Sequence, residues 1–253
     1  MTRLFRIVWR SVWLSAEMVR AALHYLLFVV PHPPPNRTQA CAQWLQQCCG
    51  RLLPVFAIEC KVSGPRPHRG MLVANHLSYL DVIILGAVAP TVFVAKSDLR
   101  RWPVFGQFAR MAGTIFVERH RRTGTSRCHL EIERTLESDV VLALFPEGTS
   151  SDGRTVLPFK SALLEPVVAT HYPLFAAGLR YTIESGDCSE EICYWGEMTF
   201  LPHLLNLLGQ EKIFASIRFA RVSQNGCGRK PLARLLHSEV LQLLGQPVVT
   251  ASL

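Results

Sequence analysis

The sequence predicts an α/β fold, with a mainly parallel sheet flanked by helices behind an N-terminal helical element. From about residue 55, short apolar runs alternate with helical segments, and the runs lack the polar alternation of a half-exposed strand. Hydrophobic residues make up 49% of the 253 residues and charged residues 18%, below the roughly 25% typical of soluble domains. Part of the surface therefore faces something other than water. We expect membrane-associating helices over residues 1–54 and one α/β domain over residues 55–253.

The first expected element is a helix over residues 3–30. Three arginines lie early in it, at Arg3, Arg6 and Arg10, and Glu17 and Arg20 interrupt its middle. The uninterrupted apolar run, residues 21–30, is shorter than the roughly 20 residues that cross a bilayer. The pattern favours a helix in the membrane interface, with its arginines near anionic headgroups. A true membrane span and an ordinary amphipathic core helix remain as alternatives.

Repeated proline over residues 31–35 ends this helix, and a second helix is expected over about residues 38–53. Five buried strands are expected after it, at residues 70–74, 91–95, 114–117, 140–145 and 174–179. Residues 235–244 are typical of an amphipathic helix. The eight cysteines lack the paired spacing of a zinc site, and no cleavable signal peptide is evident. We therefore expect free thiols, no bound metal and a cytoplasmic catalytic domain.

The segment Asn75–Asp81 directly follows the strand expected at residues 70–74. Reactive groups in open α/β sheets gather where strands end. His76 at such a position is able to accept a proton from a hydroxyl, since an unperturbed imidazole titrates near neutrality. If a helix begins near residue 77, its first turn brings Asp81 back to the imidazole and fixes the tautomer. For this pair alone, the alternative is a packed strand-end histidine beside a first-turn aspartate.

A second polar segment, residues 145–153, follows the strand expected at residues 140–145. It contains Glu147, Gly148 and Thr149, followed by further hydroxyl residues. A carboxylate, a glycine that permits close backbone approach and clustered hydroxyls form a cradle for a polar headgroup. Taken alone, the segment also fits a plain strand-to-loop turn.

Together, N-H-x-x-x-x-D at residues 75–81 and F-P-E-G-T at residues 145–149 resemble the glycerolipid acyltransferase family. Its central members are 1-acylglycerol-3-phosphate acyltransferases. Further segments resemble the family in the same order: Lys96–Leu99, Pro103–Gly106, Gly113–Arg119 and Pro158–Ser161. The resemblance covers about residues 55–182, and the residues from 183 onward match the family only weakly.

The resemblance implies an enzyme that moves a fatty acyl group from acyl-CoA or acyl carrier protein to the free hydroxyl of a lysolipid. His76 would be the general base, oriented by Asp81, with Asn75 and Ser78 in support. Substrate-binding roles would fall to five residues: Lys96, Arg119, Glu147, Gly148 and Thr149. The two cations would bind an anionic headgroup. The resemblance implies no bound cofactor, no metal and no covalent acyl-enzyme. We expect the enzyme to lie at the cytoplasmic face of the cell membrane.

Two features depart from the family pattern. Members that act on lysophosphatidic acid usually carry Arg directly after Glu-Gly-Thr, and here Ser150 removes that bidentate phosphate ligand. Ala176 stands where a second proline is common. The segment Tyr194–His203 resembles a broader branch that includes bacterial lyso-ornithine lipid acyltransferases. The first acceptor expected is 1-acyl-sn-glycerol-3-phosphate, giving phosphatidic acid, and lyso-ornithine lipid is the alternative.

The net charge of +8 leaves two other classes of function to weigh. A nucleic-acid binder would use such arginines, but the sequence contains no recognisable helix-turn-helix, zinc module or aromatic-interleaved strand pattern. We expect no nucleic-acid partner and favour attraction to the membrane surface or to an anionic donor. A non-catalytic membrane-bound scaffold is the other alternative, and the intact His76–Asp81 pair argues against it.

Overall fold

The computed structural model describes residues 2–117, 122–168, 172–223, 226 and 228–246. In this part of the chain, seven strands form one sheet in the order β1-β7-β6-β2-β5-β3-β4. Their bounds are β1 Ile58–Ser63, β2 Gly70–Ala74, β3 Thr91–Lys96, β4 Ile115–Val117, β5 Val141–Leu144, β6 Leu174–Ile183 and β7 Ile213–Val222. Strands β6, β2, β5, β3 and β4 run parallel to one another. Strand β7 pairs antiparallel with β6, and β1 pairs parallel with β7. The predicted α/β fold with a mainly parallel sheet is confirmed.

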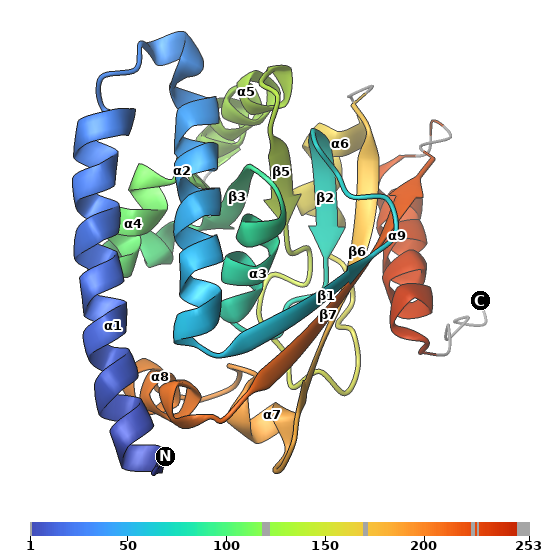
Figure 1. Ribbon diagram of the computed structural model, residues 1–253. Coiled ribbons are helices and arrows are strands. Elements are labelled where there is room, and N and C mark those ends of the chain that lie inside the picture. Colours follow the sequence, from blue (N-terminus) through green and yellow to red (C-terminus); the bar gives the residue numbers. More distant parts are fainter. Residues whose placement is uncertain (1, 118–121, 169–171, 224–225, 227, 247–253) are drawn as a thin grey trace.

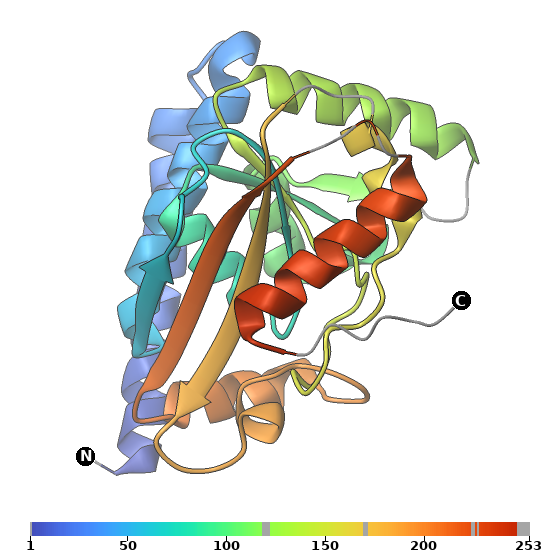
Figure 2. The same ribbon diagram turned by 90° about the vertical axis from the view of Figure 1, so that its right-hand side faces the viewer.

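Helices cover both faces of the sheet. Over one face lie α2 and α3, with α1 outside α2, and over the other lie α5 and α9 (Figures 1 and 2). The longer helices are α1 Arg3–His24, α2 Pro34–Val55, α3 Leu80–Val88, α5 Arg122–Glu137, α8 Phe200–Gly209 and α9 Arg229–Leu244. The shorter ones are η1 Tyr25–Val29, η2 Ser97–Arg101, α4 Phe105–Met111, η3 Ser161–Leu164, α6 Glu165–Val168 and α7 Cys188–Glu191.

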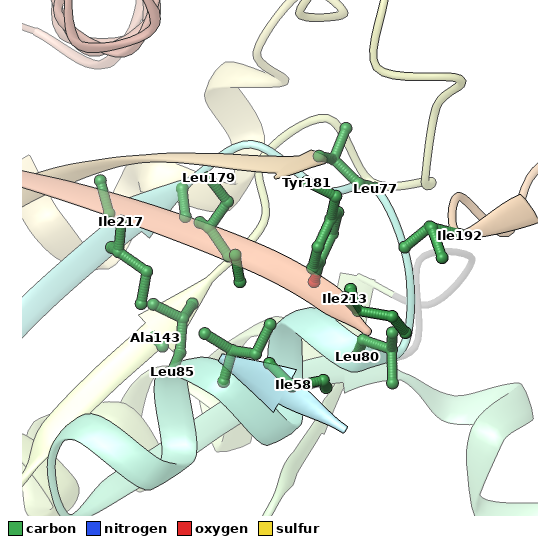
Figure 3. Close-up of a cluster of buried hydrophobic side chains, with 14 of the residues drawn as sticks. Ile58, Leu77, Leu80, Leu85, Ala143, Leu179, Tyr181, Ile192, Ile213 and Ile217 are labelled. Atoms are coloured by element: carbon green, nitrogen blue, oxygen red, sulfur yellow. The ribbon is translucent and has the colours of Figure 1, made fainter. Parts of the chain in front are cut away.

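The two faces bury different residues of the same strands. On β2, Leu72 and Ala74 belong to the core under α2 and α3, whereas Met71 and Val73 belong to the core under α5 and α9. Figure 3 shows part of the first core, where Tyr181 lies among apolar side chains. Because both faces are covered, these strands need no polar residues, and this explains their continuous apolar runs.

The sequence does not predict β1 and β7. Glu59 and Lys61 are exposed on β1, and Arg218 and Arg221 are exposed on β7. Charged residues alternate with buried ones in these two strands, so neither strand contains a continuous apolar run that would predict it. The other five strands lie within a few residues of their predicted positions, although β6 runs on to Ile183.

The first helix ends before the prolines, as predicted, after a five-residue π-helical turn at Tyr25–Val29. The second helix begins at Pro34, earlier than the predicted residue 38. Proline is tolerated in the first turn of a helix, where backbone N–H groups have no intrahelical partner. α2 ends at Val55, whose side chain lies in the core under α2 and α3. The division into two domains at residue 54 stays a prediction.

Helix α1 packs against α2 and α8 and leaves its outer face exposed (Figure 1). The Trp44 indole on α2 donates a hydrogen bond to the carbonyl oxygen of Ala21 at 3.0 Å. The exposed face is apolar and includes Leu4, Val8, Val12, Val19 and Leu23 on α1, and it continues over η1 with Leu26 and Leu27. The helical stretch Arg3–Val29 is long and apolar enough to cross a membrane by length and composition, with a mean hydropathy of 1.3 over an 18-residue window.

The sequence suggests that the arginines of α1 lie near lipid headgroups. In the structure, Arg6 and Arg10 bind α8 instead. Arg10 Nη1 donates to the carbonyl oxygens of Leu208 at 3.1 Å and Gln210 at 2.5 Å. Arg6 Nε donates to the carbonyl oxygen of Gly209 at 3.0 Å. These carbonyls lie at the C-terminal end of α8, where the last turn has no intrahelical donors and positive charge is favourable. The arginines therefore join α1 to α8.

Candidate active site

Three of the predicted site segments meet at one edge of the sheet. Strands β2, β5 and β3 are parallel neighbours, so their C-terminal ends lie side by side. Residues of the loop after β2, the loop after β5 and the end of β3 line a cavity of about 700 Å³. The fold thus brings together residues that are far apart in the sequence.

His76 and Asp81 form a hydrogen-bonded pair at this edge. His76 Nδ1 lies 2.7 Å from Asp81 Oδ2, and the Asp81 side chain, in the first turn of α3, is fully buried. A carboxylate only accepts, so in the neutral imidazole Nδ1 carries the hydrogen and Nε2 keeps its lone pair. His76 lines the cavity, and its ring stacks on Phe145 with 4.2 Å between centroids. The contact predicted from the spacing is present.

Asp81 is held by three further donors. Oδ2 also accepts hydrogen bonds from the backbone N–H groups of Leu77 at 2.6 Å and Ser78 at 3.0 Å. Oδ1 accepts one from the hydroxyl of Tyr181 at 2.6 Å. Backbone N–H groups where a loop turns into a helix lack intrahelical partners, so an aspartate in the first turn of α3 is able to take them. The four donors satisfy the buried carboxylate and fix its orientation toward the imidazole.

The sequence predicts that Glu147 lines the acceptor site; in the structure its carboxylate binds backbone, and a role in substrate binding stays a prediction. Its side chain is buried, and Oε1 accepts a hydrogen bond from the backbone N–H of His76 at 2.6 Å. Oε2 accepts one from the N–H of Leu157 at 2.8 Å. Burial raises the pKa of Glu147 to about 7, although the two backbone hydrogen bonds act in the opposite direction. Since both oxygens bind backbone, this carboxylate holds the His76 loop to the loop after β5 and is not part of the cavity lining.

The two supporting residues lie beneath the His76 loop. Asn75 pairs with the backbone of Leu179 on β6, donating to its carbonyl at 3.0 Å and accepting from its N–H at 2.8 Å. This side chain continues the pairing of β2 with β6 past the end of the strand. Ser78 is fully buried, and within the described residues its hydroxyl has no hydrogen-bond partner. Both residues therefore stabilise the loop from behind, Ser78 through its backbone N–H.

Three of the predicted binding residues line the cavity, with Ser150 beside them: Lys96, Gly148 and Thr149. Gly148 has a φ of 72°, in the left-handed region that favours glycine. The hydroxyl of Ser150 donates a hydrogen bond to the carbonyl oxygen of Tyr194. Arg119 lies outside the described residues, so its role stays a prediction.

Away from this polar end, the cavity extends to α1 and α2 and is mainly apolar, although the ion pair of Glu17 and Arg20 on α1 also lines it. Its walls include Met18, Trp44, Leu45, Leu52, Phe93 and Phe108. Apolar walls with a few polar groups at one end are typical of a site that takes a long hydrocarbon chain. An imidazole with a free lone pair at the polar end suits proton removal from a hydroxyl.

Comparisons with known proteins show the family of the chain. The Acyltransferase family model matches residues 58–180. The lyso-ornithine lipid O-acyltransferase of Brucella abortus is 37% identical over 191 residues, which cover 69% of this chain and 70% of the relative. The chain belongs to the acyltransferase family.

Two other relatives of the acyltransferase extend the comparison. The lyso-ornithine lipid O-acyltransferase of Rhizobium meliloti is 30% identical over 253 residues, covering 89% of this chain and 86% of the relative. The 1-acyl-sn-glycerol-3-phosphate acyltransferase of Neisseria gonorrhoeae is 36% identical over 174 residues, covering 68% of each. The acyltransferase is therefore an enzyme that acylates lysolipids, and its membrane association agrees with its apolar first helix.

The fold of the acyltransferase has a solved counterpart. The crystal structure of PlsC, the 1-acyl-sn-glycerophosphate acyltransferase of Thermotoga maritima, aligns with a TM-score of 0.64 over 97% of both chains. The two sequences are 20% identical, so this likeness establishes the fold alone.

The sequence alone predicts no role for Tyr181, Tyr79 or Phe200 in the acyltransferase. Tyr181 holds Asp81, and the other two line the cavity. A buried tyrosine usually needs a hydrogen-bond partner, so Tyr181 at the end of an apolar run was a signal of a polar neighbour. Phe200 carries no such signal, because a phenylalanine at the start of a helix is common in ordinary cores.

Proposed function

We propose that this lysolipid acyltransferase uses lyso-ornithine lipid as its preferred acceptor. The observation that carries the proposal is the extent of the match to the Rhizobium meliloti enzyme, which covers 89% of the chain and reaches well beyond residues 58–180. Ser150 supports the same choice, because it offers no guanidinium for a phosphate. Lyso-ornithine lipid thus takes precedence over 1-acyl-sn-glycerol-3-phosphate, the acceptor first expected from the sequence.

In this proposal His76 is the general base. Its Nε2 takes the proton from the acceptor hydroxyl while that oxygen attacks the carbonyl carbon of a thioester. The tetrahedral intermediate then collapses, the carbon–sulfur bond breaks, and the imidazolium returns the proton to the leaving thiolate. The products are the O-acylated lipid and a free thiol. Asp81 keeps the Nδ1 hydrogen in place and stabilises the imidazolium, which its 2.7 Å contact with the ring supports.

The proposed donor is a fatty acyl thioester of coenzyme A or of acyl carrier protein. The apolar part of the cavity supports this, since it gives room to the hydrocarbon chain. Lys96 and Arg119 are proposed to bind anionic groups of the headgroup or the donor. Because such thioesters are made in the cytoplasm, we assign the active site to the cytoplasmic face of the cell membrane, with α1 lying in the interface.

A second acceptor, 1-acyl-sn-glycerol-3-phosphate, is favoured by the 36% identity to the Neisseria gonorrhoeae enzyme. Lys96 and Lys160 line the cavity and supply positive charge for its phosphate. The two acceptors therefore differ in the charge that they require of the same site.

The test is acylation by purified protein in liposomes, with labelled acyl-CoA and acyl carrier protein thioesters offered against lyso-ornithine lipid and lysophosphatidic acid. Higher kcat/KM for lyso-ornithine lipid is expected, and His76→Ala is expected to abolish turnover of both acceptors. Preferred turnover of lysophosphatidic acid would reverse the acceptor assignment. Unchanged activity of the His76 variant would remove the general base.

A further inference from the structure

Three aromatic side chains form one wall of the cavity: Tyr79, Tyr194 and Phe200, here called the aromatic wall. The Tyr79 ring lies 5.5 Å from that of Tyr194 and 5.3 Å from that of Phe200, centroid to centroid. Tyr79 belongs to the His76 loop, and Phe200 begins α8. The wall therefore stands in the same cavity as the catalytic pair, and the proposed mechanism does not use it.

The hydroxyl of Tyr79 is hydrogen-bonded to His203. It lies 3.0 Å from Nδ1 of His203, whose Nε2 lies 3.0 Å from the carbonyl oxygen of Cys193. Because a carbonyl only accepts, Nε2 carries the imidazole hydrogen and Nδ1 accepts from the tyrosine. Burial lowers the pKa of His203, which keeps the ring neutral at neutral pH. The aromatic wall thus gains no positive charge from the histidine behind it.

Tyr194 is fixed between the two catalytic loops. Its N–H donates to the carbonyl oxygen of Leu77 at 2.8 Å, and its own carbonyl accepts a hydrogen bond from the hydroxyl of Ser150. Position 150 is where relatives acting on lysophosphatidic acid usually carry Arg. Ser150 therefore supplies no cation here, and its hydroxyl binds the backbone of the residue that carries the Tyr194 ring.

The cavity has positive charge elsewhere, at Lys96 on the end of β3, at Lys160 after β5 and at Arg20 on α1, which is paired with Glu17. One cavity thus combines lysines with a neutral aromatic surface. An ornithine headgroup carries a carboxylate and, three methylenes away, an ammonium, so it matches both features. A phosphate monoester has no group that an aromatic face attracts, since the face of a π system is negative.

We propose that Tyr79, Tyr194 and Phe200 bind the ammonium group of the acceptor headgroup through cation–π contacts and so determine acceptor specificity. This rests on the proposed lyso-ornithine acceptor and adds the part of the site that recognises its charge. The lysines take the carboxylate of the same headgroup, and the acceptor hydroxyl is left for His76.

The test compares two acceptors that differ only in this charge: lyso-ornithine lipid and its Nδ-acetyl derivative. The wild-type protein is expected to favour the ammonium form by about tenfold in kcat/KM. Phe200→Leu and Tyr194→Leu are expected to bring this ratio close to one, while Phe200→Tyr keeps it. Leu201→Ala, at the exposed neighbouring position, is the matched control and keeps the ratio. A ratio measured within one preparation is independent of how much of a variant is folded.

The outcomes separate the two proposals. Equal use of both ornithine acceptors by the wild-type protein, or an unchanged ratio in both leucine variants, overturns the aromatic wall as the ammonium site and leaves the acceptor assignment standing. Turnover of lysophosphatidic acid with neither ornithine acceptor overturns both.

Discussion

The hydroxyl of Tyr181 donates a 2.6 Å hydrogen bond to Asp81 Oδ1, on the carboxylate whose other oxygen holds His76. The tyrosine comes from β6 and the aspartate from the first turn of α3. The proposed catalytic pair is thus connected to the central sheet through a third side chain, and both Asp81 and Tyr181 are buried.

Replacing Tyr181 by Phe removes this donor and leaves the ring packing intact. The carboxylate then has one hydrogen bond fewer, becomes more basic and holds the imidazolium more strongly. We expect kcat to fall about tenfold, in line with the loss of one buried hydrogen bond to a charged group. The acid limb of the pH profile of kcat/KM should move to higher pH. A loss of activity with an unmoved profile would assign Tyr181 a packing role only.

Changing Asp81 to Asn keeps the shape of the side chain and removes its charge. The amide no longer stabilises the imidazolium, and it is able to hold the wrong tautomer of His76. We expect kcat to fall by about 10³-fold, within the range for general-base catalysis, for every acceptor tested. Kinetics with lyso-ornithine lipid and lysophosphatidic acid measure the effect. A loss confined to one acceptor would contradict a role in proton transfer.

Glu147 makes the stability of the protein depend on pH. Because its pKa is raised to about 7 in the folded state, the folded protein retains a proton that the unfolded chain loses above about pH 4.5. The resulting stabilisation is present at low pH and is lost as the pH rises through about 7, by at most about 3 kcal/mol. The unfolding free energy of the wild type minus that of Glu147→Gln should therefore be more positive at pH 5 than at pH 8, because only the wild type loses stability as the carboxyl group ionises. Urea unfolding in detergent at both pH values tests this, and equal differences would contradict it.

The exposed face of α1 should control membrane binding. Val19 and Leu23 are more than half exposed, so changing both to Glu removes apolar contact with lipid at little cost to the fold. We expect liposome flotation to fall at least tenfold for this double variant. Leu130→Glu on α5, equally exposed on another part of the molecule, is the control and should float as the wild type does. Equal loss in both variants would point to a general effect of added negative charge.

Local patterns predict the contact between His76 and Asp81, because the two residues are close in sequence and the start of a helix fixes their geometry. The roles of Glu147 and Tyr181 depend on contacts across long stretches of chain. Glu147 binds a backbone N–H 71 residues away, and Tyr181 binds a carboxylate 100 residues away. No periodicity or spacing encodes such contacts, so the sequence alone indicates neither of them. The buried strands were found because they are covered on both faces, whereas β1 was missed because Glu59 and Lys61 interrupt it.

The arginines that join α1 to α8 change the meaning of an N-terminal truncation. Deleting the first helix to obtain a more soluble enzyme would also uncap α8, since Arg6 and Arg10 supply donors to its terminal carbonyls. Helix α8 carries Phe200 and His203, and both contact the Tyr79 ring. A shortened protein would therefore differ from the native enzyme in its active-site wall as well as in its affinity for lipid. Weak activity in such a protein would say little about the need for a bilayer.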